Sequence, residues 1–178
     1  MPFRPMLCAF AAAATLAGCA SLYDVAPQTV ATSRISSATG APIGTMQIVS
    51  TAGRLHANVQ LTGLAAGTHA VHLHQVGRCQ APDFTSAGAH LNPAGRTHGS
   101  LSPTGPHLGD LPNIIIGASR TGTLTADLRA ASSDVLAHLF DADGTAIVVH
   151  AQADDYRTDP TGNAGGRIGC GVVERAGD

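Results

Sequence analysis

Alternating apolar and polar residues mark the first clear structural element, which lies between residues 45 and 61. Met46 and Ile48 alternate with polar neighbours, a break follows at Ala52-Gly53, and the alternation resumes from Leu55 to Leu61. Side chains along a strand point to opposite faces in turn, so a period of two on both sides of a turn predicts a β-hairpin.

The same alternation and several short apolar runs continue along the chain. In residues 69–74, Val71 and Leu73 point one way while His72 and His74 point the other. Pro and Gly are frequent in residues 102–112, which predicts a loop. No stretch supports a long amphipathic helix, and many short strands separated by turns favour an all-β sandwich or barrel. Further strands are predicted at 114–116, 121–128, 135–140, 146–150 and 167–173.

Composition agrees with this pattern and excludes some functions. A chain of 178 residues has room for one domain with a proper core. All ten basic residues are arginines and they are scattered singly, so neither a nucleic-acid footprint nor a basic membrane patch is visible. Only 3% of residues are aromatic while 21 are glycine, as expected of short strands joined by tight turns.

The N-terminal segment has the features of an export signal. Arg4 precedes an alanine-rich apolar run from Pro5 to Ala17, which is shorter than the roughly 20 residues needed to span a bilayer. The end of this run, Leu16-Ala17-Gly18-Cys19, resembles the bacterial lipobox, whose cysteine carries lipid in the mature protein. An ordinary signal peptide with a chance cysteine is the alternative. We expect export to the periplasmic side or cell envelope, with 1–18 as signal peptide, 19–30 as lipidated N-terminus and flexible tether, and 31–178 as the folded domain.

Histidines gather in one part of the chain. Five of the nine lie between His72 and Asp110, and His150 ends an apolar strand. Imidazole and carboxylate donors at this density suit zinc and copper, so we predict a metal centre. Seven donors are too many for one tetrahedral zinc but divide between two metals if one imidazole is shared. The candidate donors are His72, His74, His90, His98, His107, Asp110 and His150; the remaining histidines, His56, His69 and His138, are interpreted as ordinary structural residues.

Two cysteines remain in the body of the chain once the leader is set aside. Cys79 and Cys170 form an even pair, and in an oxidising compartment they would be the obvious disulfide.

Several separated motifs together resemble the copper/zinc superoxide dismutase family over about Thr45 to Glu174. The motifs are HAVHLH, SAGAHLNPAGRTHG, GPHLGDLPNI, VVHAQADD and GNAGGRIGCGV. The resemblance implies an eight-stranded Greek-key β-barrel with long metal-binding and electrostatic loops. It implies one copper per subunit on His72, His74, His90 and His150, and one zinc per subunit on His90, His98, His107 and Asp110. It also implies a carboxylate at Asp154 linking His72 to His98, an arginine beside copper at Arg167, and the Cys79–Cys170 disulfide.

The resemblance also implies an activity. Two superoxide anions and two protons become dioxygen and hydrogen peroxide while copper alternates between two oxidation states. His90 would be the bridging imidazolate, which releases reduced copper and takes a proton, and Arg167 would attract and orient the anion. An ion pair between Arg167 and a nearby aspartate is the alternative for that residue.

Other interpretations remain at this point. The loop from 151 to 169 holds Asp154, Asp155, Arg157, Asp159 and Arg167 but no lysine, so anion steering is expected to be weaker or differently arranged. A lipoprotein that buffers copper or zinc without turnover would use the same ligands. Superoxide is the expected partner, with no nucleic acid and membrane contact only through the lipid, and a homodimer is left open.

Overall fold

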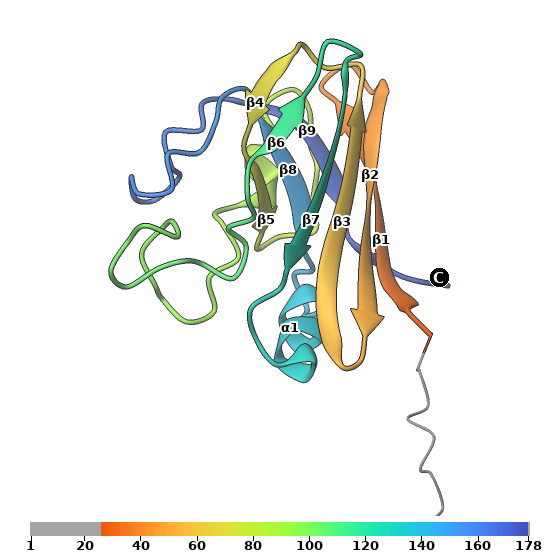
Figure 1. Cartoon of the computed structure of the whole chain (residues 1–178), viewed down its shortest axis with the longest axis vertical. Coiled ribbons are helices and arrows are strands. Elements are labelled where there is room, and N and C mark those ends of the chain that lie inside the picture. Colours follow the sequence, from red (N-terminus) through yellow and green to blue (C-terminus); the bar gives the residue numbers. More distant parts are fainter. Residues whose placement is uncertain (1–25, 178) are drawn as a thin grey trace, which may run out of the picture.

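A computed structural model describes residues 26–177 of the chain (Figure 1). Within this part, nearly all regular structure is β, as predicted, with one short α-helix and one 3₁₀ turn. The strands are β1 (Gln28–Ser37), β2 (Pro42–Thr51), β3 (Arg54–Thr62), β4 (Gly67–His69), β5 (Val71–His74), β6 (Ile114–Ile116), β7 (Thr121–Asp127), β8 (Ala146–His150), β9 (Arg167–Val172) and β10 (Glu174–Arg175); the helices are η1 (Thr85–Ala87) and α1 (Ser132–Leu139).

The strands form a curled antiparallel sheet that encloses one main apolar core. The order of strands in the sheet is β5-β8-β9-β1-β2-β3-β7, with β10 added beside β1, while β4 and β6 make a separate pair. Neighbours that are distant in sequence, such as β5 with β8 and β9 with β1, are the crossovers expected of a Greek-key arrangement. The predicted fold class is therefore confirmed.

The hairpin predicted from alternation is formed by β2 and β3. Met46 pairs with Val59 and Ile48 pairs with Ala57, and all four side chains are buried. The two-residue turn at Ala52 and Gly53 has positive φ at both residues, the conformation that is favoured in short β-hairpin turns.

Two local predictions differ from the structure. Residues 135–140 are predicted as a strand but belong largely to α1, where the buried Val135 and Leu139 lie four residues apart on one helical face. The strand β1 was not predicted, because its inward positions are Ala31, Ser33 and Ile35, and the first two are too small or polar to give a clear alternation.

The boundary of the predicted tether also moves. β1 begins at Gln28, so the last residues of the segment predicted as tether belong to the sheet. Cys19 and the predicted signal peptide lie outside the described residues. Among residues 26–177, no helix has the length and apolar character that crossing a membrane requires.

The two long loops lie on one side of the barrel. The loop from 75 to 113 joins β5 to β6, and the loop from 151 to 166 joins β8 to β9. In Figure 1 both extend beyond β5 and β8, away from β2 and β3. All the side chains predicted to bind metal come from β5, from β8 and from the loop that follows β5.

Candidate metal centre

The first cluster consists of four buried histidines from two strands and one loop. His72 and His74 come from β5, His150 ends β8, and His90 lies in the loop after β5. A hydrogen-bonded bridge between His74 and His90 ties that loop back onto the strand. One nitrogen from each ring lies within 4.8 Å of the other three, so the cluster could hold a metal ion.

Each ring in this cluster directs one nitrogen to an acceptor and the other into the cluster. His72 Nε2 donates to Asp154 Oδ2 over 2.9 Å, His74 Nδ1 donates to Gly88 O over 2.9 Å, and His150 Nδ1 donates to Gly165 O over 3.3 Å. Oxygen acceptors of this kind fix the tautomer and leave the second nitrogen with its lone pair free. The free nitrogens are His72 Nδ1, His74 Nε2, His90 Nε2 and His150 Nε2.

These four free nitrogens are buried and have no hydrogen-bond partner among the described residues. A buried polar atom without a partner costs folding free energy, so four of them facing one another need an explanation. A cation bound by four imidazole nitrogens provides one, since copper and zinc both accept this donor. The residues therefore fit the metal that the family resemblance implies.

The second cluster is built around Asp110. Its Oδ1 lies 3.0 Å from His90 Nδ1 and 3.1 Å from both His98 Nδ1 and His107 Nδ1. Four ligands about 2.0–2.1 Å from a tetrahedral zinc lie roughly 3.3–3.4 Å apart, so these separations suit a zinc site. Asp110 Oδ2 accepts hydrogen bonds from the backbone N–H groups of Gly99 and His107, which orients the carboxylate.

Two residues connect the clusters. His90 presents Nδ1 to the second cluster and Nε2 to the first. Asp154 is buried and accepts from His72 Nε2 through Oδ2 and from His98 Nε2 through Oδ1, at 2.9 Å in each case. The carboxylate therefore links one histidine of each cluster, as the family resemblance implies.

Burial and neighbouring charges change the proton affinities in both clusters. Burial, with the charge of His90, lowers the pKa of His74 to about 2, and burial lowers the pKa of His90 to about 4 and of His150 to about 3. These rings are therefore neutral near pH 7, the form that binds metal.

The carboxylates have the opposite effect on their neighbours. Burial alone would lower the pKa of His98, but hydrogen bonds to Asp110 and Asp154 outweigh it and raise that pKa to about 9. Burial alone would likewise raise the pKa of Asp110 and Asp154, yet hydrogen bonds from histidines hold both well below the usual range. Both carboxylates are therefore ionised at any ordinary pH.

Arg167 is held by the loop that carries the disulfide, not by an aspartate. Its Nη1 donates to Phe84 O and its Nη2 donates to Gly88 O, both over 2.7 Å. No ion pair of Arg167 with a carboxylate occurs among residues 26–177, so the alternative of a surface salt bridge is wrong. The predicted disulfide is present, since Cys79 and Cys170 are bonded with a Cα–Cα distance of 5.6 Å.

The three histidines interpreted as structural have different surroundings. His56 pairs with Asp127 on the outer surface, and His138 lies on α1 and belongs to neither cluster. His69 is buried and donates from Nδ1 to the backbone oxygen of His150 over 2.9 Å, so it supports the first cluster without contributing a donor. Its position three residues before His72 was the available signal in the sequence.

Comparison with known proteins settles the family. The family model for copper/zinc superoxide dismutase (SODC) matches residues 43–173. The chain belongs to the copper/zinc superoxide dismutase family. This match confirms the predicted family, and with it the enzyme class and the copper and zinc cofactors of the family.

Individual relatives agree with this assignment. The chain is 39% identical over 150 residues to a superoxide dismutase [Cu-Zn] of Caulobacter vibrioides, covering 81% of this chain and 85% of the relative. It is 40% identical over 141 residues to superoxide dismutase [Cu-Zn] 1 of Aquifex aeolicus, covering 76% and 82%. The crystal structure of a SOD-like protein from Bacillus subtilis superposes with a TM-score of 0.73 at 34% identity, covering 79% of this chain and 96% of that one.

Proposed function

We propose that this chain binds copper at the cluster of His72, His74, His90 and His150, binds zinc at the cluster of His90, His98, His107 and Asp110, and shares His90 between them. The observation that carries the proposal is the set of four buried ring nitrogens that face one another without a hydrogen-bond partner. His90 is the single residue that contributes to this set and also contacts Asp110.

Copper in this cluster would supply one-electron redox chemistry, cycling between Cu(II) and Cu(I), while zinc keeps one oxidation state. The chemistry converts two superoxide anions and two protons into one dioxygen and one hydrogen peroxide. His90 Nε2 is the atom at which we propose that a proton is held between the two halves of the reaction. Its Nδ1 remains directed at the zinc cluster throughout.

Arg167 supplies the positive charge for the anionic substrate. Its guanidinium is half-buried and held by two backbone oxygens, so its orientation is fixed before the substrate arrives. An arginine stays charged at any working pH, and a charge focused in a cleft can raise association rates by about 10-fold to 1000-fold. Arg167 would attract the superoxide anion by its charge, and His90 Nε2 would hold a proton for it.

The alternative function, metal buffering without turnover, uses the same ligands and is separated by one assay. Protein loaded with one copper and one zinc is mixed with superoxide, and the second-order decay rate is compared with that of protein loaded with zinc alone. We expect decay to accelerate only with copper present, and His56→Ala, which alters a histidine outside both clusters, to keep the full rate. A protein that binds both metals stoichiometrically and leaves the decay rate unchanged would be a buffer.

We also propose that the chain is exported and anchored to a membrane through lipid on Cys19. Support comes from the basic and apolar leader and from the Leu16-Ala17-Gly18-Cys19 sequence. Cells expressing the full chain are labelled with a fatty acid. Label that disappears in Cys19→Ala and persists in Cys8→Ala supports the proposal, whereas label that persists in Cys19→Ala contradicts it.

A further inference from the structure

We propose that Asn113 is a positioning residue that holds Asp154, and through it one histidine of each cluster, in the geometry that binds metal. The inference rests on the proposed assignment of the two clusters as metal sites. Among the described residues, Asn113 makes no hydrogen bond to a candidate ligand. It lies three residues after Asp110, immediately before β6.

The side chain of Asn113 binds both backbone groups of Asp154. Asn113 Nδ2 donates to Asp154 O over 2.9 Å, and the backbone N–H of Asp154 donates to Asn113 Oδ1 over 2.8 Å. Within residues 26–177 these two backbone groups of Asp154 have no other hydrogen-bond partner. A planar amide that uses donor and acceptor at once fixes both the position and the direction of the peptide it binds.

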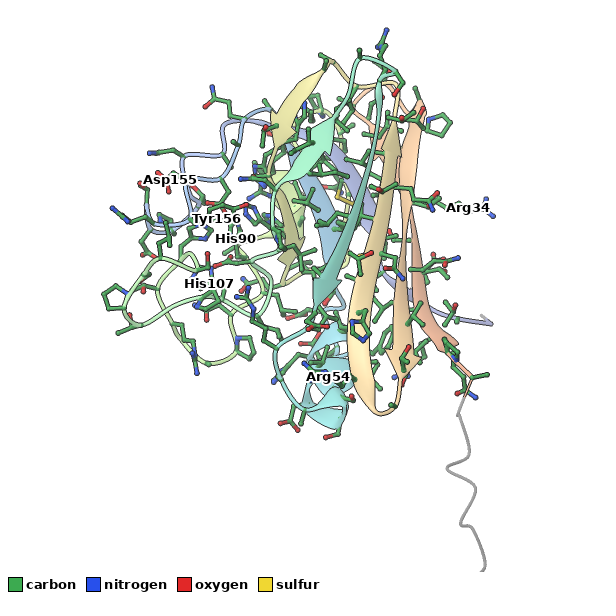
Figure 2. The ribbon with its side chains drawn as sticks, viewed as in Figure 1. Arg34, Arg54, His90, His107, Asp155 and Tyr156 are labelled. Carbon is green, nitrogen blue, oxygen red and sulfur yellow. A yellow bond between two sulfur atoms is a disulfide. The ribbon has the colours of Figure 1, made fainter. Side chains whose placement is uncertain are left out.

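A second contact closes a ring of hydrogen bonds. The backbone N–H of Asn113 donates to the hydroxyl oxygen of Tyr156 over 2.7 Å. The backbone N–H of Tyr156 donates in turn to Asp154 Oδ1 over 2.7 Å. Figure 2 shows Tyr156 on the same side of the barrel as His90 and His107. The carboxylate of Asp154 is therefore oriented by Tyr156, whose hydroxyl is in turn bound by Asn113.

The carboxylate of Asp154 in turn orients one histidine of each cluster. Asp154 accepts from His72 through Oδ2 and from His98 through Oδ1, which fixes the ring orientation of each. The loop from 151 to 166 contains no strand or helix that could hold residue 154 in place. Asn113 instead ties this loop to the chain where it enters β6, whose first residue, Ile114, is fully buried.

Removal of this tie is expected to weaken metal binding more than it disturbs the fold. Partners that orient metal-binding histidines typically change metal affinity by about 10-fold to 100-fold when they are lost. The expected loss for Asn113→Ala lies in that range for zinc. Copper bound beside the zinc is expected to show an altered visible absorption band, because His72 loses its fixed orientation.

The test uses demetallated protein with its disulfide intact and measures Zn²⁺ affinity by competition with a chelator. Asn113→Ala is compared with Asn58→Ala, which removes the same side chain from β3, where Asn58 accepts a hydrogen bond from Thr125 on the outer surface. Asn113→Asp has nearly the same shape but places a second acceptor against Asp154 O, so it is expected to lose zinc affinity as well. Tyr156→Phe, which keeps the amide pairing, is expected to lose less.

Three outcomes are decisive. Zinc affinity that falls at least 10-fold in Asn113→Ala and stays within about twofold of wild type in Asn58→Ala supports the role of Asn113. Affinity that is unchanged in Asn113→Ala, or in Asn113→Asp if the alanine variant does not fold, overturns it. Wild-type protein that binds no zinc contradicts the proposed function first, which keeps the two failures apart.

Discussion

His74 and Arg167 donate hydrogen bonds to the same atom, the backbone oxygen of Gly88. The distances are 2.9 Å from His74 Nδ1 and 2.7 Å from Arg167 Nη2. Gly88 has a φ of 75°, a conformation that favours glycine, and this allows its carbonyl to face both side chains. One backbone oxygen therefore sets the position of the guanidinium relative to a candidate copper ligand.

Reversal of the charge at Arg167 should slow the capture of superoxide. In Arg167→Glu we expect kcat/KM to fall at least about 10-fold and its salt dependence to flatten, because the attraction for the anion is lost. Arg34→Glu makes the same change in net charge on β1, on the side of the molecule away from His90 in Figure 2. If the two variants lose activity equally, net charge and not the position of Arg167 controls the rate.

A methyl group at Gly162 should disrupt the link between the clusters. A Cβ there would lie 1.9 Å from Asp154 Oδ1 and 2.6 Å from His98 Nε2, and the φ of +66° adds backbone strain. We expect Gly162→Ala to bind Zn²⁺ about 10-fold to 100-fold more weakly, as measured by chelator competition. Gly166→Ala is the matched control, since a Cβ at Gly166 meets nothing within 4 Å. Equal affinities in the two variants would count against the proposed role of Asp154.

The disulfide should stabilise the fold and hold the arginine. Cys79 and Cys170 are 91 residues apart, and a loop of that length corresponds to roughly 4–5 kcal/mol of unfolding free energy in the chain-entropy model. The bonded loop also carries Phe84, whose backbone oxygen accepts from Arg167. Reduced wild type and the variant with both cysteines replaced by serine should therefore unfold at lower urea concentration and lose kcat/KM. Unchanged urea midpoints would show that the bridge is dispensable for stability.

The demetallated protein should be most stable near pH 6.5. His74, His90 and His150 have pKa values lowered to about 2, 4 and 3, so the unfolded chain binds more protons below pH 6.5 and stability falls as pH drops. The pKa of His98 is raised to about 9, so its contribution is present below pH 6.5 and is lost as pH rises through 9.

Urea unfolding of demetallated protein from pH 4 to pH 9.5 checks this expectation. Stability should fall steeply on the acid side, because three groups act there and each pKa unit of difference corresponds to about 1.4 kcal/mol. His98→Gln should remove the decline on the alkaline side and leave much of the acid decline. A stability that keeps rising between pH 6.5 and 9 in wild type would contradict the raised pKa of His98.

Much of the fold was predictable because alternation is a local signal. The β2–β3 hairpin and β8 follow from apolar residues at period two or in short runs next to turn residues. The strand prediction at 135–140 was wrong because a run of apolar residues this short fits a helix equally well. In the structure, Val135 and Leu139 lie on one face of a helix and pack against the core. β1 was missed because Ala31 and Ser33 are buried by the topology and not by their own hydrophobicity.

The residues of the two candidate metal clusters could be named from the sequence, whereas the groups that orient them could not. Histidine at a candidate ligand position is visible in the sequence, whereas the acceptor that orients it is often a backbone oxygen with no sequence signal. Gly88 O, which holds His74 and Arg167, is one such case. Asn113 is another case. An asparagine in a Pro/Gly-rich loop is common, and only the structure shows that its side chain binds the loop from 151 to 166.

The most direct measurement is a crystal structure of the oxidised protein loaded with one copper and one zinc. We expect His90 to bind zinc through Nδ1, at about 2.0–2.1 Å, and copper through Nε2. A His90 ring bound to a single metal in that state would contradict the shared-imidazole centre.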